Sequence, residues 1–552
     1  MRGYLLLTLS VLIWVTIFQA VYSQQSNLPN LNQQFVTYQK QSNFIHEFNV
    51  PVNQRGLKGI VTDSHGNPWF YYQTNNESII MKFDLANSTF KSFPVYGKTI
   101  ADAPVINLAG GQMIYDEKRN SIWFTDARIN SLGYINLQNE NSTLHKIPTN
   151  NSGIMGLALS PDNNTIWFAE IIGNKIGNFD INSKAIIEYP TGEFTGPTLL
   201  TLDKKGQLWV TLSYSHSVLK VQPWLLVPES RTGGMTEIGL EKPDTFSPFG
   251  IAISNVSNSS KMFTSDHGSS RVIVSDLSSE LTNYTSYWTS PSQAYPASLP
   301  SQVISDKLGN IYFAQHGGNK ISKINASTGE MTEYDIPTGP LATVVYIATS
   351  PDISKIWFTE WASNRIAYLD NEIKVPLELK VNNSLPITLK SNQTVPLDIL
   401  VTNQNTNETP TASLNGVEVS LVGMTDSGLQ GLTYVAKPQR FNMTESNING
   451  TIDVIVDTNN AIAGKYTIMP RISTLGKDRL TVSQLFPQVV SLDVPVHKAQ
   501  LQNFTTSNNN ENSNSPYLFL RDLARYASAG VAVTLIGYLV FRKVKQRRLE
   551  NK

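Results

Sequence analysis

The sequence predicts an all-β protein: a seven-bladed β-propeller, then an immunoglobulin-like β-sandwich, then a single C-terminal transmembrane helix. Three observations support this prediction: a phrase repeated seven times, a later region of alternating apolar and polar residues, and an apolar stretch that precedes a basic C-terminal tail. The 552 residues include no cysteine, so buried apolar surface rather than disulfide bonds must stabilise these domains.

The repeated phrase is a hydrophobic tetrad followed by a small polar loop and a second short apolar strand. Its copies recur at intervals of 42 to 54 residues and begin at Trp69, Trp123, Trp167, Trp209, Phe263, Tyr312 and Trp357. An apolar run precedes most copies, and an amphipathic run follows, so each unit supplies four short strands. This period and content are typical of propeller blades, which must stack because one blade cannot bury both of its faces. We place the propeller at residues 44–371.

The last unit lacks an outer strand of its own. The segment FIHEFNVPV, which starts at Phe44, resembles such a strand and lies ahead of the first unit. We therefore predict that the N-terminal segment closes the ring by pairing into the last blade. The alternative is that IKVPLEL, which starts at Ile373, supplies the missing strand.

Residues 372–498 have a different texture, with alternating runs such as VPLDILVTN from Val395 and VEVSLVG from Val417. Short alternating strands at this spacing predict an antiparallel sandwich of immunoglobulin-like type, a module that usually acts as a spacer or an adhesive surface. The polar, Asn/Ser-rich residues 499–516 predict a flexible stalk.

The two ends of the chain predict its location. Residues 1–23 have the charged start, apolar stretch and small residues of a secretory signal peptide. Residues 526–541 carry no charge and precede the basic tail 542–552. Although 16 residues is short of the roughly 20 that span a bilayer, the basic tail supplies a stop-transfer signal and Arg525 can snorkel. We expect a single-pass protein of the cell membrane with its N-terminal domains extracellular; a buried amphipathic helix is the alternative.

Composition is consistent with a surface glycoprotein. Asn-X-Ser/Thr acceptor patterns recur in the expected loops, for example at Asn76, Asn141 and Asn325. The 43 basic and 43 acidic residues balance, which argues against a nucleic-acid partner because such proteins normally carry a basic excess. The expected partners are the membrane, through the C-terminal helix, and an extracellular small molecule, glycan or protein.

Two copies of the phrase, WFAEIIGNKIG from Trp167 and WFTEWASNRI from Trp357, resemble the W-F-T-E-x-x-x-N-K-I-G phrase of the virginiamycin B lyase (streptogramin lyase) family. The resemblance covers about residues 44 to 371. It implies a seven-bladed propeller, carbon–oxygen lyase activity, a magnesium ion on the central axis, and catalytic histidines in a Pro-His-Gly/Ala-Ile phrase ahead of the tetrad.

The chain departs from that catalytic pattern. The corresponding phrases, which start at Leu57, Ile154, Pro248 and Ser301, contain no histidine. Phe249 stands where the base is expected, and a phenyl ring cannot accept a proton. Ser247 stands where the family can place a metal-binding glutamate. We therefore do not expect this chain to open a streptogramin ring by the family's mechanism.

A different set of residues could form a site. Aligned without gaps, successive units place polar side chains just after the tetrad, at equivalent positions around one rim of the central channel. The predicted metal ligands are Asp266, His267, His316 and Glu360, with His267 and His316 also as the catalytic pair; the predicted ligand rim is Asp126, Glu170, Gln315 and Trp361. Imidazoles and carboxylates together suit a divalent ion such as zinc, manganese or magnesium.

The same residues also fit an ordinary structural role. A His-Gly pair is typical of a turn with a solvated ring, and a carboxylate at the end of a strand often accepts backbone hydrogen bonds. Two functional hypotheses therefore remain. One is a membrane-anchored surface protein that binds a ligand or partner. The other is an extracytoplasmic metal-dependent lyase or lactone hydrolase with its site on the propeller axis.

Overall fold

The computed structural model describes residues 42–493, apart from 75, 100–109, 229–232, 240–246, 257–258, 280, 282–283, 382–387, 391, 404–415, 426–431, 443–448, 460, 476–478 and 486–489. The signal peptide, stalk, transmembrane helix and basic tail predicted from the sequence lie outside these residues. Within the described ranges, no helix is long and apolar enough to cross a membrane.

The repeats form four-stranded antiparallel sheets, which we number along the chain. The first four are β2 (Leu57–Thr62), β3 (Pro68–Gln73), β4 (Ser78–Asp84) and β5 (Thr89–Pro94); β6 (Met113–Asp116), β7 (Ser121–Asp126), β8 (Ser131–Asn136) and β9 (Ser142–Lys146); β10 (Ile154–Leu159), β11 (Thr165–Glu170), β12 (Lys175–Asp180) and β13 (Ile186–Pro190); and β14 (Pro197–Leu202), β15 (Leu208–Leu212), β16 (Ser217–Val221) and β17 (Met235–Gly239).

The fifth sheet is β18 (Pro248–Val256), β19 (Ser259–Asp266), β20 (Arg271–Asp276) and β21 (Tyr284–Trp288). The sixth begins with β22 (Pro300–Ser305), β23 (Ile311–Gln315), β24 (Lys320–Ile324) and β25 (Glu330–Asp335). The seventh is β26 (Ile347–Thr349), β27 (Lys355–Glu360), β28 (Arg365–Asp370) and β1 (Ile45–Asn49). Each copy of the repeated phrase lies in the second strand of its sheet, as the period predicts. Single-turn 3₁₀ helices occur at Glu117–Arg119, Pro223–Leu225 and Leu277–Ser279.

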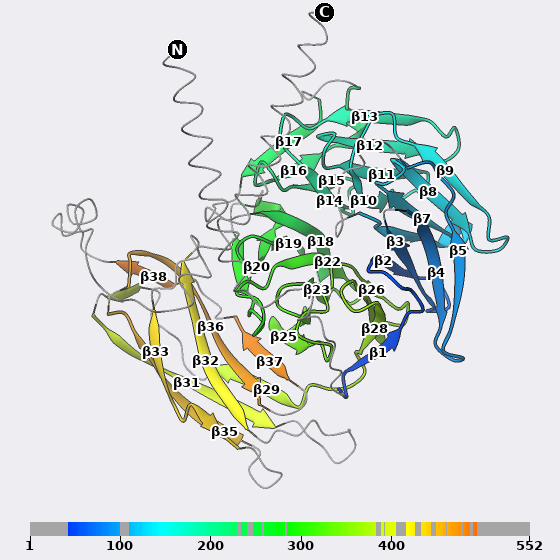
Figure 1. The fold of residues 1–552 in the computed structure, drawn as a ribbon. Helices are drawn as coiled ribbons and strands as arrows, with labels where there is room; N and C mark the ends of the chain where they lie inside the picture. The colour runs from blue at the N-terminus through cyan, green and yellow to red at the C-terminus, as the bar shows by residue number, and fades with distance from the viewer. Residues whose placement is uncertain are drawn as a thin grey trace, which may run out of the picture.

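The sheets are arranged as a propeller (Figure 1). The first strand of each sheet lies nearest the centre, and these inner strands contact one another in the closed order β2, β6, β10, β14, β18, β22, β26 and back to β2. The outer strands lie at the circumference. The ends of the inner strands therefore surround one axis, which is where a shared site can form.

The N-terminal strand closes the ring. β1 pairs antiparallel with β28, in a register that runs from Ile45 opposite Leu369 to Asn49 opposite Arg365. This pairing confirms the predicted role of the segment that starts at Phe44. The alternative segment supplies β29 (Leu377–Val381) instead, which pairs with a strand of the next domain.

Apolar side chains from neighbouring sheets interlock to form the core. Trp357 of the seventh sheet is fully buried and meets Phe83 of the first sheet edge to face, with ring centroids 6.1 Å apart. Trp69 and Trp209 are buried as well, and each donates its indole N–H to an aspartate at the end of the preceding strand, 3.0 Å to Asp63 and 3.1 Å to Asp203. The tryptophans of the repeat thus serve packing, because their large rings bury apolar area. In Trp69 and Trp209 the one polar atom of the ring also has a partner.

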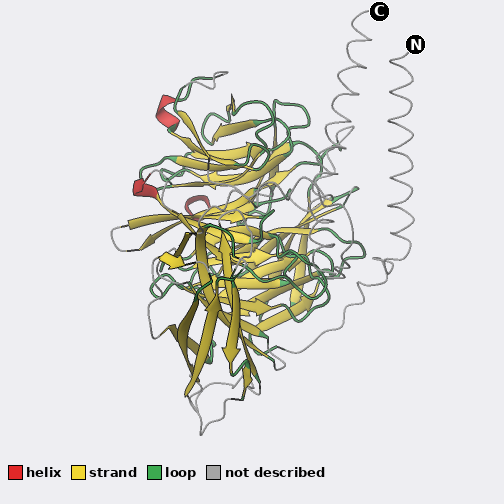
Figure 2. Ribbon diagram, turned by 90° about the vertical axis from the view of Figure 1, so that its left-hand side faces the viewer, coloured by secondary structure: helices red, strands yellow, loops and turns green. Residues whose placement is uncertain are grey.

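The region after the propeller consists of two facing layers of strands. One layer is β29, β31 (Thr394–Asn403), β35 (Asn449–Asp457) and β33 (Thr433–Lys437); the other contains β32 (Val417–Thr425), β34 (Arg440–Phe441), β36 (Gly464–Thr474) and β37 (Leu480–Gln484), with β30 (Thr388–Lys390) and β38 (Val490–Asp493) at its side. Alternate residues of both layers, such as Leu397, Val419 and Ile452, share one buried core. Figure 2 shows that strands dominate both regions.

This sandwich is continuous with the sixth propeller sheet. β37 pairs antiparallel with β25, from Glu330 opposite Gln484 to Tyr334 opposite Leu480, so that one sheet of ten strands spans both regions. Arg471 of β36 is buried and donates a hydrogen bond to the carbonyl of Trp288 in the fifth sheet. The sandwich is therefore built into the propeller wall, a connection that the sequence, which predicted a spacer or an adhesive surface, did not indicate.

Closure of the ring generates a first prediction. Phe44 is 2% exposed and packs against Tyr334 of the sixth sheet, with ring centroids 5.5 Å apart. Phe44→Ala should lower the free energy of unfolding by about 3–5 kcal/mol, because it leaves a cavity at the closing strand. Urea denaturation of both proteins checks this. Tyr96→Ala, at a ring that is 83% exposed, is the control and should change stability by less than about 0.5 kcal/mol.

The junction between propeller and sandwich generates a second prediction. Arg471→Ala should destabilise the protein by about 3 kcal/mol, because it removes a buried donor and leaves its polar partners without one. Arg440→Ala is a matched control in the same layer, since Arg440 is exposed and forms a surface ion pair with Glu418 at 3.0 Å. Such a pair contributes about 0–1 kcal/mol. Equal losses in the two variants would show that Arg471 does not tie the domains together.

Candidate functional site

In six of the seven sheets the second strand ends at the fourth tetrad residue, and the next residue begins a turn. The fourth tetrad residue pairs in register with the first residue of the third strand, for example Glu170 with Lys175 and Asp266 with Arg271. Five of these fourth residues are polar and fully buried: Asp126, Glu170, Asp266, Gln315 and Glu360.

The two aspartates among them have structural partners. Asp126 accepts hydrogen bonds from the hydroxyl of Tyr71 at 2.7 Å and the amide of Gln73 at 2.6 Å, both in the first sheet. Asp266 forms a buried ion pair with Arg271 at 2.9 Å and accepts the backbone N–H of Ser247 at 3.0 Å. Both carboxylates therefore hold strands and turns in place.

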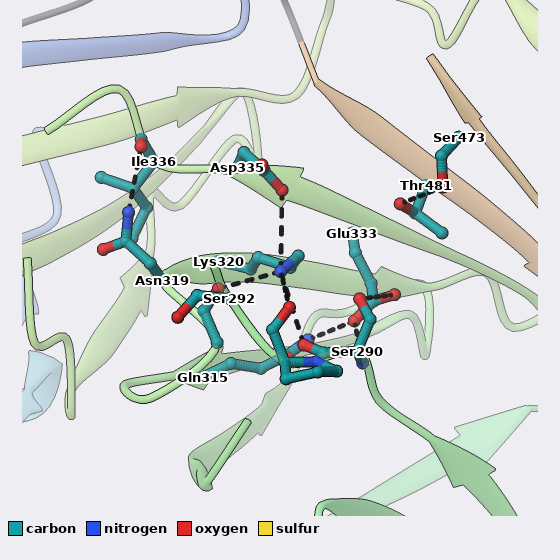
Figure 3. Close-up of polar contacts among 12 residues, drawn as sticks. Ser290, Ser292, Gln315, Asn319, Lys320, Glu333, Asp335, Ile336, Ser473 and Thr481 are labelled. Carbon is teal, nitrogen blue, oxygen red and sulfur yellow. Dashed lines mark hydrogen bonds and ion pairs between the residues drawn. The ribbon is translucent and has the colours of Figure 1, made fainter. Parts of the chain in front are cut away.

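Glu360 and Gln315 also point into the wall. Glu360 accepts a hydrogen bond from Ser363 at 2.6 Å, and burial together with the adjacent Glu47 raises its pKa well above the ordinary value. Gln315 donates to Glu333 at 2.8 Å (Figure 3). Rim positions 126, 170 and 315, predicted from the sequence, thus lie between strands.

His267 follows Asp266 in the chain and His316 follows Gln315, and these two histidines do come together. Their ring centroids are 4.8 Å apart, and Phe249 lies 5.7 Å from His267 on its other side. Nδ1 of His267 lies 3.1 Å from the carbonyl oxygen of Pro300, the first residue of the inner strand β22. The pair is half-buried at the end of the ring where the inner strands of the fifth and sixth sheets begin.

Both imidazoles are held in the neutral form. Burial lowers the pKa of His267, although the Pro300 carbonyl and Asp266 act in the opposite direction. Burial, and then the neighbouring His267, lowers the pKa of His316 well below its ordinary value. Nδ1 of His316 is one of the buried polar atoms of the described chain that have no hydrogen-bond partner.

A β-bulge shapes the start of several inner strands. The register shifts between Pro248 and Ile251 and between Leu57 and Ile60, which is where the family phrase falls. Bulges re-aim side chains, and this one places Phe249 beside His267. In the first sheet the same position holds Lys58, which donates to Gln73 at 2.8 Å; burial lowers its pKa to about 8. In the sequence, Lys58 belongs to the phrase that starts at Leu57, which was noted only because it contains no histidine.

Trp361 occupies in the seventh sheet the position that the two histidines occupy in the fifth and sixth. It is partly exposed, and the guanidinium carbon of Arg55 lies 5.7 Å from its ring centroid. Its place at the ring end matches the predicted rim. Arg55 was not predicted, and nothing in its sequence context marks it.

The four predicted metal ligands divide between two environments. His267 and His316 face the ring end, whereas Asp266 and Glu360 have partners in the wall. Among the residues that the structure describes, no three His, Asp or Glu side chains are grouped so that they could hold a metal ion. Magnesium prefers oxygen ligands, and this end offers imidazole, so the residues do not fit the family's magnesium. Binding of another cation by the two histidines stays a prediction.

The lowered pKa values generate a third prediction. Below pH 6.5, where an ordinary histidine takes up a proton, His267 and His316 should remain neutral because their folded pKa values are depressed. Nuclear magnetic resonance of ¹⁵N-labelled histidine rings from pH 5 to pH 8 checks this, with His267→Ala and His316→Ala assigning the signals. Titration of both rings at the ordinary pKa would contradict the burial that the structure shows.

The propeller is similar to proteins of known structure and family. The model of the virginiamycin B lyase family matches residues 39–258. Among solved structures, a streptogramin B lyase is 22% identical with a TM-score of 0.48, over 59% of this chain and 97% of that one. A selenomethionine-substituted virginiamycin B lyase from Staphylococcus aureus is 21% identical with a TM-score of 0.48, over 59% and 98%. The search of curated proteins found no match. The family match confirms the resemblance read from the repeats: the ring is a virginiamycin B lyase-like β-propeller.

Proposed function

We propose that this protein is a membrane-anchored, extracytoplasmic binding protein, in which a seven-bladed propeller and an immunoglobulin-like sandwich present one end of the propeller axis to a surface ligand. The observation that carries the proposal is the cluster of His267, His316 and Phe249 at the ring end. It combines aromatic rings with a buried imidazole nitrogen that has no hydrogen-bond partner among the described residues.

The chemistry of this cluster favours binding over the family's elimination reaction. The position of the family's base holds Phe249, which cannot transfer a proton. Nδ1 of His267 lies against the Pro300 carbonyl, so Nε2 is the nitrogen left as an acceptor. Asp266, the carboxylate next to it in sequence, forms its ion pair with Arg271 in the wall. Among the described residues, neither imidazole therefore has a carboxylate partner that would strengthen it as a general base.

The same cluster suits an uncharged polar ligand such as a glycan. A neutral imidazole both donates and accepts a hydrogen bond, and the Phe249 and Trp361 rings offer flat apolar surface. Ligand sites typically combine such surface with a few polar groups. Charged ligands would find little complement, because the buried carboxylates and their cations neutralise one another within the wall.

Anchorage rests on the sequence alone: the predicted signal peptide at 1–23, the apolar stretch at 526–541 and the basic tail at 542–552. With the sandwich joined to the sixth sheet, the two domains would be displayed together on the predicted stalk at residues 499–516. A ligand of the cell envelope or of a neighbouring cell is then the expected class.

A metal-dependent lyase or lactone hydrolase is the second candidate. It is favoured by the 4.8 Å separation of two neutral imidazoles, which are good ligands for zinc. His267 and His316 would hold the ion, which would supply Lewis-acid polarisation of a carbonyl oxygen. With only two ligands from the described protein, the substrate would have to complete the coordination.

A fourth prediction separates these functions. The full chain in detergent should bind a glycan on an array, and His267→Ala/His316→Ala should reduce binding at least tenfold, whereas the exposed His65→Ala should leave it unchanged. Calorimetric titration of zinc, manganese and magnesium should show no stoichiometric binding. Zinc or manganese binding that the double variant abolishes would favour the metalloenzyme. Unchanged glycan binding in the double variant would remove the ring end as the binding site.

A further inference from the structure

Three sheets share one hydrogen-bonding frame next to the turn after the second strand. In each, a glutamate of the outermost strand lies opposite the third residue of the third strand: Glu188 opposite Gly177, Glu333 opposite Ser322, and Glu47 opposite Ala367. Each glutamate accepts the backbone N–H of a residue in the loop from the preceding sheet, at 2.8 Å from Thr149, 3.0 Å from Ser290 and 2.9 Å from Thr338. The three sites are therefore equivalent, and differences between them are informative.

The sixth sheet shows how the frame is completed by a neutral donor. There the amide of Gln315 donates to Glu333 at 2.8 Å, and the hydroxyl of Ser290 donates to the other oxygen of Glu333 at 2.8 Å (Figure 3). A Cβ on Gly318 would lie 2.6 Å from Oε1 of Gln315, so the glycine leaves room for this side chain. Glu333 thus accepts a hydrogen bond from the neutral side chain of Gln315.

In the third sheet the equivalent residue is Glu170, with the same surroundings. A Cβ on Gly173 would lie 2.5 Å from Oε2 of Glu170, which matches the closeness of Gly318 to Gln315. Glu170 is fully buried, and neither of its oxygens has a hydrogen-bond donor among the described residues. A buried, ionised carboxylate without a hydrogen-bond donor is energetically costly. The site therefore favours the protonated, uncharged form of Glu170.

The charged groups that face Glu170 are Glu188 on β13 and Lys175 on β12. The ammonium of Lys175 bonds to Glu188 at 2.8 Å and to the Thr149 hydroxyl at 2.7 Å. Lys175, the cation that faces Glu170 among the described residues, is therefore paired with Glu188. If Glu170 were ionised too, two buried carboxylates would share one ammonium, whereas a protonated Glu170 can act as Gln315 does.

We propose that Glu170 is a neutral carboxylic acid that donates its O–H to Glu188, and that this bond is an alkaline-sensitive clasp between the second and third sheets. The clasp joins β11 to β13 and, through Glu188, to Thr149 in the loop that leaves the second sheet. This device is independent of the ligand proposed for the ring end.

The sign of the pH dependence follows from the proton count. Burial, and then Glu188, raises the pKa of Glu170 from 4.5 to about 9. The folded protein therefore keeps a proton that the unfolded chain releases. The contribution to stability is complete below pH 4.5, decreases as the pH rises, and is lost above about pH 9. Ionisation replaces an attractive O–H···O contact by repulsion between two carboxylates.

Glu170→Gln tests the proposal, because the sixth sheet shows that this frame accepts a glutamine. The ratio of the unfolding constants of wild type and variant should increase at least tenfold between pH 6 and pH 9, in favour of the variant. Hydrogen exchange of the full chain in detergent should locate the effect. Protection of residues 147–153 and 170–177 should decrease at pH 9 in wild type and be retained in the variant. Equal pH dependence of the two proteins would overturn the proposal.

A charge-matched control and a direct readout complete the experiment. Glu193→Gln removes a carboxylate from an exposed position in the loop after β13 and should keep the wild-type pH dependence. Infrared spectroscopy at pH 7 should show a protonated carboxyl band that is weaker in Glu170→Gln and unchanged in Glu193→Gln. A wild-type band that Glu170→Gln leaves intact would show that Glu170 is ionised and would refute the clasp.

Discussion

The point at which the second strand of each sheet ends and its turn begins is the constraint on which the rest of this structure depends. Sheets that radiate from one axis have two kinds of surroundings: the dry contact between neighbours and the open end of the ring. The last residues of these strands, such as Asp126, Glu170 and Gln315, form a layer of buried charge and amide groups in the wall. The first turn residues of the fifth and sixth sheets, His267 and His316, meet each other at the end of the ring.

That division accounts for the chemistry of the ring end. Its acidic groups are withdrawn into the wall, where Asp266 meets Arg271 and Asp126 meets three donors of the first sheet. What remains outside is aromatic and imidazole surface around Phe249, His267 and His316. This composition is the basis of the proposal that the ring end binds a neutral polar ligand. The ring resembles a virginiamycin B lyase propeller, and Phe249 stands where that resemblance implies a catalytic base.

The repeats predicted the propeller and its closing strand because both depend on local patterns, a period near 45 residues and a lone strand-like segment at Phe44. The extension of the sixth sheet by Leu480–Gln484 could not be predicted, since pairing between edges of distant domains leaves no mark in either segment. For the site, a gap-free alignment brought His267 and His316 together correctly but added Asp266 and Glu360, because alignment gives position and not direction. The phrases HEF, IEY and TEY around Glu47, Glu188 and Glu333 carried the signal for the wall network.

Closure by the first strand also determines when the ring can be finished. The side chains of Asn49 and Arg365 bond across the closing pair although 316 residues separate them in the chain. Contacts between residues so far apart in the sequence form slowly. Because the chain is synthesised from the N-terminus, β1 stays unpaired until β28 has been made. Until then, the edges of both strands are open to pairing with other chains. Completion of the propeller is therefore a late event that follows synthesis of all seven of its sheets.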